Sequence, residues 1–292
     1  MAIEDLIVVG DRINPGFRST KKIIEAEDMD ALQALARRQV ESGAHYLDIT
    51  VGPRGYTDAK FLTEVIHVLQ DAVDVPLCFD YPSVEVQEVC LKAYDLAKAG
   101  GRRPLVNSIA ETRLEIIGLM KICPFQVIVM TSEYLEDGTP QMTKHARDVV
   151  GVAQRIGGKL IREHEFSPDD IFIDVTINSM ISDTEGLTKM ALDAIGQIRQ
   201  DSVLKDVHIM GGLTNLGNML PPKEYDGVRL RLMMERAFLT VAIPLGFDTV
   251  MATPWHDYQA LPSDHEVLLA FKEVSELTGM DAMRRLRKLW AS

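Results

Sequence analysis

The segment DIFIDVTINSMISDTEGLTKMALDAIGQIRQDSVLKDVHIMGGLTN (residues 170–215) decides the fold, because it holds a complete strand–helix–strand unit. Its two ends, 170–177 and 208–215, are short apolar runs with little polar alternation. Strands buried on both faces of a parallel sheet have this pattern. Between them, residues 184–201 carry apolar side chains at helical spacing. The segment therefore predicts two parallel strands joined by a crossover helix.

The same alternation extends over the whole chain. Strands are predicted at eight runs: 6–10, 45–50, 76–81, 104–109, 125–131, 170–177, 208–215 and 248–254. Further helical patterns at 29–43 and 83–100 each end in glycine, a usual helix stop. Eight strand–helix repeats favour a closed (β/α)₈ barrel, the TIM barrel, over an open doubly wound sheet. We predict one α/β barrel domain over residues 1–292.

An open sheet that binds nucleotides would carry a glycine-rich phosphate loop after its first strand. The corresponding stretch, VGDRINPG (9–16), matches neither the dinucleotide nor the P-loop pattern. No linker or low-complexity segment divides the chain.

Composition excludes several classes of function. The chain has 292 residues, is 46% hydrophobic and carries a net charge of −12, which argues against nucleic acid and anionic membranes as partners. No apolar run reaches the roughly 18 residues that a bilayer span requires. The start, MAIEDLIVVG, places acids before a short apolar run, unlike a signal peptide. Three widely spaced cysteines without a CxxC pair fit a reducing cytoplasmic location.

Polar residues fall at the ends of most predicted strands. They are Asp11, Asn14, Asp48, Asp80, Asn107, Ser108, Asp174 and Asn215. Any one of them alone would usually be a turn former or a helix cap. Asp80 and Asp174, however, lie inside apolar runs, where a carboxylate costs several kcal/mol unless it is paired or hydrogen-bonded.

In a TIM barrel the carboxyl ends of all strands meet at one mouth. Many acids and amides at that mouth favour a ligand that offers many hydrogen-bond donors. No glycine-rich cradle or lysine cluster marks a phosphate site. The edge of a reduced pterin, with adjacent N–H and NH₂ groups, would satisfy several carboxylates without a cation.

Six motifs resemble those of the pterin-binding methyltransferases. They are VGDRIN (9–14), YLDITVG (46–52), FDYPS (79–83), NSIA (107–110), FIDVT (172–176) and GLTN (212–215). This family includes the methyltetrahydrofolate:corrinoid/iron–sulfur protein methyltransferases and the folate domain of cobalamin-dependent methionine synthase. The resemblance covers nearly the whole chain; dihydropteroate synthase shares the barrel but is a more distant match.

The resemblance implies roles for particular residues. Asp80, Asn107 and Asp174 match the set that holds the pterin ring edge, and Asn215 matches the asparagine that hydrogen-bonds the pterin N5 region. The remaining folate-binding positions that it implies are Asp11, Asp48, Ser108, Gly212, Asn218 and Arg231. Asp48 is expected deep inside the mouth of the barrel, and Arg231 is expected near the pterin. Gly212 is expected at a point where the backbone must approach the ligand closely.

The sequence also departs from the family pattern. Asp11 stands where relatives usually have Glu, Thr214 where they have Ser, and Glu235 where Asn is expected. The segment SEYLEDGTP (132–140) looks like a longer and more acidic loop than that of the relatives. These differences leave the partner and the physiological substrate open.

The resemblance implies methyl transfer between a protein-bound corrinoid and N5 of tetrahydrofolate, with 5-methyltetrahydrofolate as the methylated form. Asn215 is the expected catalytic residue, and no catalytic His, Glu or metal is required. No DxHxxG-type corrinoid signature is present, so the corrinoid is expected on a partner protein. A homodimer is expected by analogy alone.

Two settings remain open for this activity. The chain is the folate-side component either of an anaerobic demethylation (O-demethylase-type) system or of acetyl-CoA metabolism, where it would serve the corrinoid/iron–sulfur protein. The departures from the family pattern favour the first setting.

Two further functions are more distant alternatives. Dihydropteroate synthase would need a strand-seven Lys and a strand-eight Arg-His pair, which GGLTN and MATP lack. A folate-binding protein without turnover is the non-enzymatic alternative.

Three other features have plain structural interpretations. His164 and His256 have acidic neighbours but no metal spacing, which predicts surface or capping roles. Cys78 is predicted to pack in the core, pointing out of the barrel if Asp80 points in. The basic stretch MRRLRKLW (283–290) is predicted to be a final helix packed on the barrel or on a dimer mate.

Overall fold

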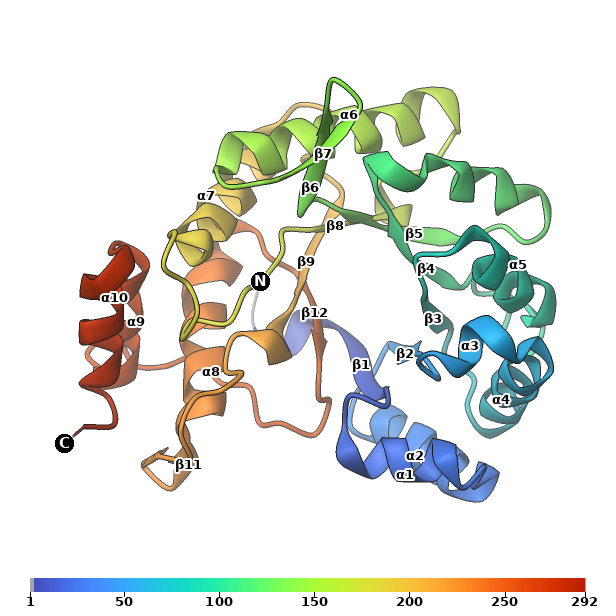
Figure 1. Ribbon diagram of the computed structural model, residues 1–292, viewed down its shortest axis with the longest axis horizontal. Helices are drawn as coiled ribbons and strands as arrows, with labels where there is room; N and C mark the ends of the chain where they lie inside the picture. Colours follow the sequence, from blue (N-terminus) through green and yellow to red (C-terminus); the bar gives the residue numbers. More distant parts are fainter. Residues whose placement is uncertain (1–2, 292) are drawn as a thin grey trace.

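Eight parallel strands form a closed barrel in the computed structural model, which describes residues 3–291 (Figure 1). The strands are β1 (Ile7–Ile13), β2 (Tyr46–Ile49), β3 (Leu77–Asp80), β4 (Leu105–Ile109), β5 (Gln126–Met130), β8 (Ile171–Asp174), β9 (His208–Gly212) and β12 (Thr249–Ala252). The first and last strands pair in parallel, with Ile7 opposite Thr249, and this pairing closes the ring. The predicted (β/α)₈ barrel is confirmed.

The strands lie where the apolar runs predict them, with one extension. Seven of them fall inside the predicted runs, whereas β1 continues beyond residue 10 to Ile13. Its pairing with β2 shifts register between Gly10 and Ile13, where Ile13 meets Ile49. This irregularity at the end of β1 displaces the chain beside Asp11 and Arg12.

Helices surround the barrel on its outer side (Figure 1). The α-helices are α1 (Arg18–Glu25), α2 (Met29–Glu41), α3 (Arg54–Thr57), α4 (Ala59–Ala72), α5 (Val84–Ala93), α6 (Ala146–Glu163), α7 (Leu187–Gln200), α8 (Leu230–Ala242), α9 (Glu266–Ser275) and α10 (Gly279–Arg287). The 3₁₀ segments are η1 (Ile3–Asp5), η2 (Glu111–Lys121), η3 (Pro168–Asp170), η4 (Leu213–Asn215) and η5 (Ile243–Leu245). The connection from β4 to β5 thus runs through η2 and not through an α-helix.

The helix predicted over 83–100 ends early, at Ala93. The side-chain amide of Gln70 bonds both backbone groups of Asp95, donating to the carbonyl at 2.9 Å and accepting from the N–H at 2.9 Å. These bonds replace the helical partners of Asp95 and turn the chain toward β4.

A small cluster of apolar side chains is separate from the main core between strands and helices. It takes one residue from each of six barrel strands: Val9, Cys78, Leu105, Ile128, Phe172 and Met210. Their shared origin places the cluster inside the barrel, as the packed floor of the mouth. Core packing of Cys78 is confirmed, but its predicted outward direction is wrong. Residues two apart in a strand share a face, so Cys78 lies on the same side as Asp80.

Two β-hairpins are added to the barrel. The segment 132–140, predicted as a loop, forms most of an antiparallel hairpin of β6 (Glu133–Glu136) and β7 (Thr139–Met142). This hairpin bonds to η2, because the Leu135 N–H donates to Glu111 Oε2 at 2.6 Å. A second, shorter hairpin pairs β10 (Glu224–Tyr225) with β11 (Val228–Arg229) just before α8.

The C-terminal helix packs on the barrel domain, as predicted. Leu286 and Leu289 are buried, and α10 lies against α9 (Figure 1). Within residues 3–291, none of the helices is long and apolar enough to cross a bilayer.

Candidate active site

A cavity of about 450 Å³ opens at the carboxyl ends of the barrel strands. Its lining comes from segments far apart in the sequence: Asp11, Asn14, Gly16, Phe17, Asp48, Asp80, Gly212, Thr214, Asn215, Asn218, Arg231 and Met251. We call it the acid cavity, because three buried or half-buried carboxylates face it. Seven of the ten predicted site residues line this cavity.

The three carboxylates of the acid cavity come from β1, β2 and β3. Burial raises the pKa of Asp11, although Thr214 donates a 2.6 Å hydrogen bond to its Oδ2 and Thr253 lies at 3.3 Å from its Oδ1. Burial also raises the pKa of Asp80 to about 6, and nearby Arg113 opposes this shift. Burial thus disfavours the charged form of both carboxyl groups, and a ligand that donates hydrogen bonds to them would oppose this effect.

Asp48 is the most buried of the three, with an exposed fraction of 1%. Burial raises its pKa well above the ordinary value, and the charges of Asp80 and Asp11 act in the same direction. Its Oδ1 atom has no hydrogen-bond partner among the residues that the structure describes. A buried carboxylate oxygen without a partner costs free energy, and a donor-rich ligand in the acid cavity would remove that cost.

Three predicted site residues lie outside the lining of the acid cavity. Asn107 is buried beside it, opposite Asp80 in the β3–β4 ladder and close enough to Asp48 to lower its pKa. Asp174 ends β8, and its Oδ1 accepts from the Thr176 N–H at 2.7 Å. Burial raises the pKa of Asp174 to about 6. Ser108 is held by Arg113, which donates to the Ser108 carbonyl and hydroxyl, each at 2.9 Å.

Gly212 and Asn215 fit each other at the end of β9. A methyl group on Gly212 would lie 2.8 Å from Asn215 Nδ2, closer than real side chains approach. The absence of a side chain at 212 therefore lets the Asn215 amide lie against the backbone at the cavity rim. The short helix η4 then carries the chain to Asn218, whose N–H donates to the Asn215 carbonyl at 3.0 Å.

Arg231 is held in place by its own helix and by η4. Its guanidinium donates to the Thr214 carbonyl at 2.7 Å and to Glu235 Oε1 at 3.3 Å. Glu235 is fully buried, and its second oxygen lies 3.4 Å from His256 Nδ1. The His256 side chain is thus 31% exposed while it bonds a buried acid, and His164 is the C-cap residue of α6, as predicted. Sequence spacing gave no signal for the pairing of residues 235 and 256.

A second cavity, of about 590 Å³, adjoins the first and shares Arg231 with it. It is lined by Arg12, Gly227, Val228, Arg229, Arg231, Leu232, Arg236, Thr253, Trp255, His256 and Asp257. We call it the arginine cavity. This cavity was not predictable from the sequence, because its members come from β1, the β10–β11 hairpin, α8 and the segment after β12.

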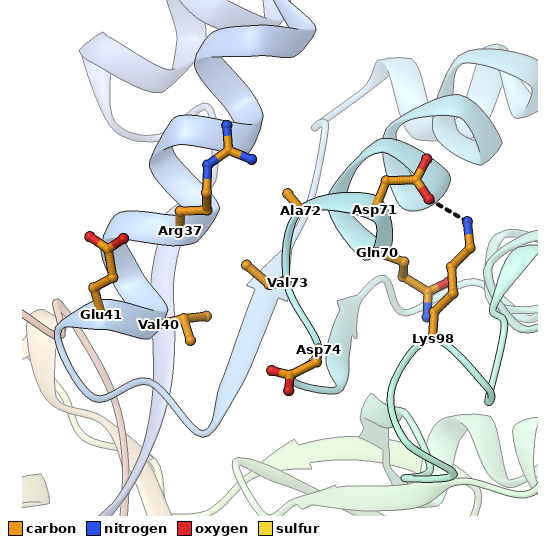
Figure 2. Close-up of a pocket in the computed structure, with 9 residues that line it drawn as sticks. All are labelled: Arg37, Val40, Glu41, Gln70, Asp71, Ala72, Val73, Asp74 and Lys98. Carbon is orange, nitrogen blue, oxygen red and sulfur yellow. Dashed lines mark hydrogen bonds and ion pairs between the residues drawn. The ribbon is translucent and has the colours of Figure 1, made fainter.

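A third cavity, of about 630 Å³, lies at the opposite end of the barrel (Figure 2). Its residues come from the C-terminal ends of α2 and α4 and from the segments that lead into the next strands. Figure 2 shows the Lys98–Asp71 ion pair on its edge. This end of a TIM barrel serves stability, while chemistry belongs to the mouth. Among residues 3–291, no cluster of three or more His, Cys, Asp or Glu side chains could hold a metal ion.

Comparison with known proteins gives results that agree with this geometry. The profile of the family described as "Pterin binding enzyme" matches residues 13–252. The methylcorrinoid:tetrahydrofolate methyltransferase of Eubacterium limosum is 25% identical over 255 residues, which cover 85% of this chain and 85% of the relative.

Solved structures with the same fold include two dihydropteroate synthases. The enzyme from Stenotrophomonas maltophilia, with active site-bound imidazole, has a TM-score of 0.58 at 18% identity, covering 99% of this chain and 94% of that one. The enzyme from Xanthomonas albilineans in complex with 7,8-dihydropteroate has a TM-score of 0.54 at 18% identity, covering 100% and 96%. At such identities the likeness shows the fold alone.

Proposed function

The chain belongs to the pterin-binding enzyme family, and from this premise we propose that it moves a methyl group between a corrinoid carried by a partner protein and N5 of tetrahydrofolate. The similarity to the methylcorrinoid:tetrahydrofolate methyltransferase of Eubacterium limosum supports this reaction class. Tetrahydrofolate and 5-methyltetrahydrofolate are then substrates, and the corrinoid remains bound to its own protein.

The observation that carries the proposal is the set of buried acids in the acid cavity. Asp11, Asp48 and Asp80 face one space, and Asp48 Oδ1 lacks a partner within residues 3–291. Carboxylates accept hydrogen bonds when ionised, and a pterin ring edge offers adjacent N–H and NH₂ donors. A neutral pterin would satisfy these acceptors without bringing a second buried charge, which suits the barrel interior better than a cation would.

The catalytic role falls to Asn215, at the rim of the acid cavity. In the direction of tetrahydrofolate methylation, the N5 lone pair forms the new bond to the methyl carbon. The carbon–cobalt bond breaks, and its electron pair stays on cobalt. N5 then carries positive charge and releases its proton to water.

A neutral amide serves both directions of this reaction. The Asn215 side chain can accept from N5–H or donate to N5, and it does not itself change charge. A hydrogen bond that tightens as charge develops on N5 stabilises the transition state more than the bound substrate. Positioning two large substrates in line supplies the larger share of the rate.

The test of this role is Asn215→Ala in single-turnover methyl transfer. We expect a loss on the order of 10²-fold in rate, because one preorganised contact is removed, while tetrahydrofolate still binds. Asn178→Ala is the matched control, since that side chain bonds the Thr176 carbonyl and lies outside the acid cavity. An unchanged single-turnover rate in Asn215→Ala, with tetrahydrofolate binding intact, would contradict the proposed role of the amide.

We place the reaction in an anaerobic demethylation system, in which methyl-corrinoid from an upstream step is consumed to form 5-methyltetrahydrofolate. The alternative is transfer from 5-methyltetrahydrofolate to the corrinoid/iron–sulfur protein of acetyl-CoA metabolism. The departures at Asp11, Thr214 and Glu235 favour the first setting. Following the cobalt spectrum with isolated candidate corrinoid proteins, in both directions, separates the two.

The same spectral assay tests the non-catalytic alternative, because a folate-binding protein without turnover would leave the cobalt spectrum unchanged. A dihydropteroate synthase would instead release pyrophosphate from a pterin pyrophosphate and p-aminobenzoate. Such an enzyme would need a lysine at strand seven and an Arg-His pair at strand eight. A histidine, His256, does follow β12, but it contacts Glu235, and no lysine lines the acid cavity.

A further inference from the structure

Arg113 is a largely buried cation near the acids of the barrel mouth. It belongs to η2, where its backbone leaves the helical conformation with φ −149° and ψ 48°. Its side chain is only 19% exposed, whereas arginines in proteins usually keep their charge in water. Neither the acid cavity nor the arginine cavity includes Arg113 in its lining. Any part that it plays at the mouth must therefore act through its neighbours.

The Arg113 guanidinium holds the carboxyl end of β4. Its Nε donates to the Ser108 carbonyl and its Nη2 to the Ser108 hydroxyl, each at 2.9 Å. Ser108 directly follows Asn107, which lies opposite Asp80 in the β3–β4 ladder. The two bonds to Ser108 thus fix the guanidinium beside the strand pair that carries Asn107 and Asp80.

The β6–β7 hairpin contributes an anion to this arrangement. Glu133 Oε1 lies 3.6 Å from an Arg113 nitrogen and also accepts from the Thr112 hydroxyl at 2.6 Å. Burial lowers the pKa of Arg113, and the charges of Glu133, Glu115 and Asp80 oppose this effect. One ion pair at 3.6 Å offsets only part of the Arg113 charge at its other neighbours.

Asp80 is the neighbour that faces the acid cavity. The titratable groups that interact with it are Asp48 of β2, Cys78 of β3, Tyr81 after β3 and Arg113 of η2. Among these, Arg113 carries the positive charge, and it opposes the rise that burial causes in the pKa of Asp80. The two side chains form no ion pair within residues 3–291. Arg113 therefore favours the ionised carboxylate without occupying its oxygens.

We propose that Arg113 is a positioning residue for pterin binding, which holds the end of β4 from η2 and keeps Asp80 in the ionised form that accepts hydrogen bonds from the ligand. This inference rests on the proposed function, because it assumes that the pterin lies in the acid cavity. An ionised carboxylate only accepts hydrogen bonds, whereas a protonated one carries an O–H. That O–H would face the N–H and NH₂ donors of the pterin edge and leave a donor unpaired.

The test measures tetrahydrofolate binding by calorimetry under anaerobic conditions, at pH 6 and at pH 8.5. The affinity of the parent protein should fall as the pH falls through about 6, because Asp80 then takes up a proton. We expect Arg113→Gln to bind about 5-fold more weakly than the parent at pH 6 and equally well at pH 8.5, because Asp80 without the cation takes up its proton at a higher pH. A merely structural role would weaken binding equally at both pH values.

Two further arginine variants separate charge from shape. Arg113→Lys should keep the pH profile of the parent, since an ammonium group supplies the same charge. Arg155→Gln is the matched control, because Arg155 of α6 forms an ion pair at 2.5 Å with Glu111, which also belongs to η2. Its side chain is 55% exposed, and the variant should match the parent at both pH values.

Glu133→Gln tests the same inference from the opposite direction, and it decides the matter if Arg113→Gln does not fold. Glutamine keeps an acceptor for the Thr112 hydroxyl but removes the anion that faces Arg113. The full charge of Arg113 then acts on Asp80, so Glu133→Gln should bind tetrahydrofolate more tightly than the parent at pH 6 and equally at pH 8.5. Unchanged or weaker binding at pH 6 would contradict the inference.

The outcomes distinguish this inference from the proposed function. Equal weakening of Arg113→Gln at both pH values would overturn the role of the Arg113 charge, as would an equal pH-dependent loss in Arg113→Lys. A parent protein whose affinity is the same at pH 6 and pH 8.5 would also overturn it and leave the pterin site standing. If the parent protein binds no tetrahydrofolate at either pH, the proposed function fails, and the role of Arg113 fails with it.

Discussion

At the scale of single residues, the rim of the acid cavity depends on a glycine. Gly212 has an ordinary negative φ of −75°, so backbone freedom is not what requires glycine there. The requirement is space, because the Asn215 amide occupies the position that a side chain would take.

Gly212→Ala should therefore impair the reaction more than the fold. The added methyl would stand 2.8 Å from Asn215 Nδ2 and push the amide out of place. We expect a loss on the order of 10²-fold in single-turnover rate, similar to removal of the amide. The melting temperature should change little, since a rim side chain can shift toward solvent.

Gly196→Ala is the control for this substitution. It lies within α7, and nothing is within 4 Å of the position of its added methyl. We expect an unchanged rate and a slight gain in stability, because alanine favours a helix. Equal rates in Gly212→Ala and the parent protein would show that the amide does not need its present position.

Much of the acid cavity was predictable from the sequence at this scale. Asp48 and Asp80 lie near the carboxyl ends of short apolar runs, and the ends of parallel strands must share the mouth of a barrel. Ser108 shows the limit of that argument, because its hydroxyl accepts from the Arg113 guanidinium and lies outside the lining of the acid cavity. Arg12 was missed, since its partners Phe17 and Trp255 are identified only by the folded chain.

At the scale of elements, the strands were easier to predict than their connections. An apolar run of five or six residues has few alternatives in a buried parallel sheet. The hairpin β6–β7 was not recognised, because its strands are exposed and carry no apolar alternation. Its geometry depends on contacts with η2, such as the Thr112 hydroxyl bond to Glu133 Oε1 at 2.6 Å.

The helix α10 offers a prediction at this scale, because it joins the domain through few side chains. Leu286 is fully buried between α10 and α9, and Leu286→Ala should lower the free energy of unfolding by about 2–4 kcal/mol. Leu269 on α9 is 44% exposed, and Leu269→Ala should cost less than about 0.5 kcal/mol. Urea unfolding measures both. Equal costs would mean that α10 is not packed as described.

At the scale of the whole molecule, the acids of the mouth make stability depend on pH. Burial raises the pKa of Asp174 to about 6, above its ordinary value of 3.8. The folded state therefore holds this proton more tightly than the unfolded chain does. The free energy of unfolding must then fall as the pH rises from about 4 through 6.

Asp174→Asn should remove that part of the pH dependence. An asparagine keeps the acceptor for the Thr176 N–H but carries no charge to bury. We expect the ligand-free variant to exceed the parent by about 1–3 kcal/mol at pH 8 and to match it near pH 4. Asp206→Asn, at an exposed position, should follow the parent protein at both pH values. A constant difference between Asp174→Asn and the parent across this range would contradict the assignment.

Arg231, which stands between the acid cavity and the arginine cavity, has a consequence for how these two spaces communicate. Arg231 lines both cavities, and its guanidinium donates hydrogen bonds to the Thr214 carbonyl and to the Glu235 carboxylate. A ligand in one cavity that fixes the position of the Arg231 guanidinium also fixes this group in the other cavity. Thermodynamic reciprocity then requires that any effect of an occupant of one cavity on the affinity of the other cavity is matched by an equal effect in the reverse direction.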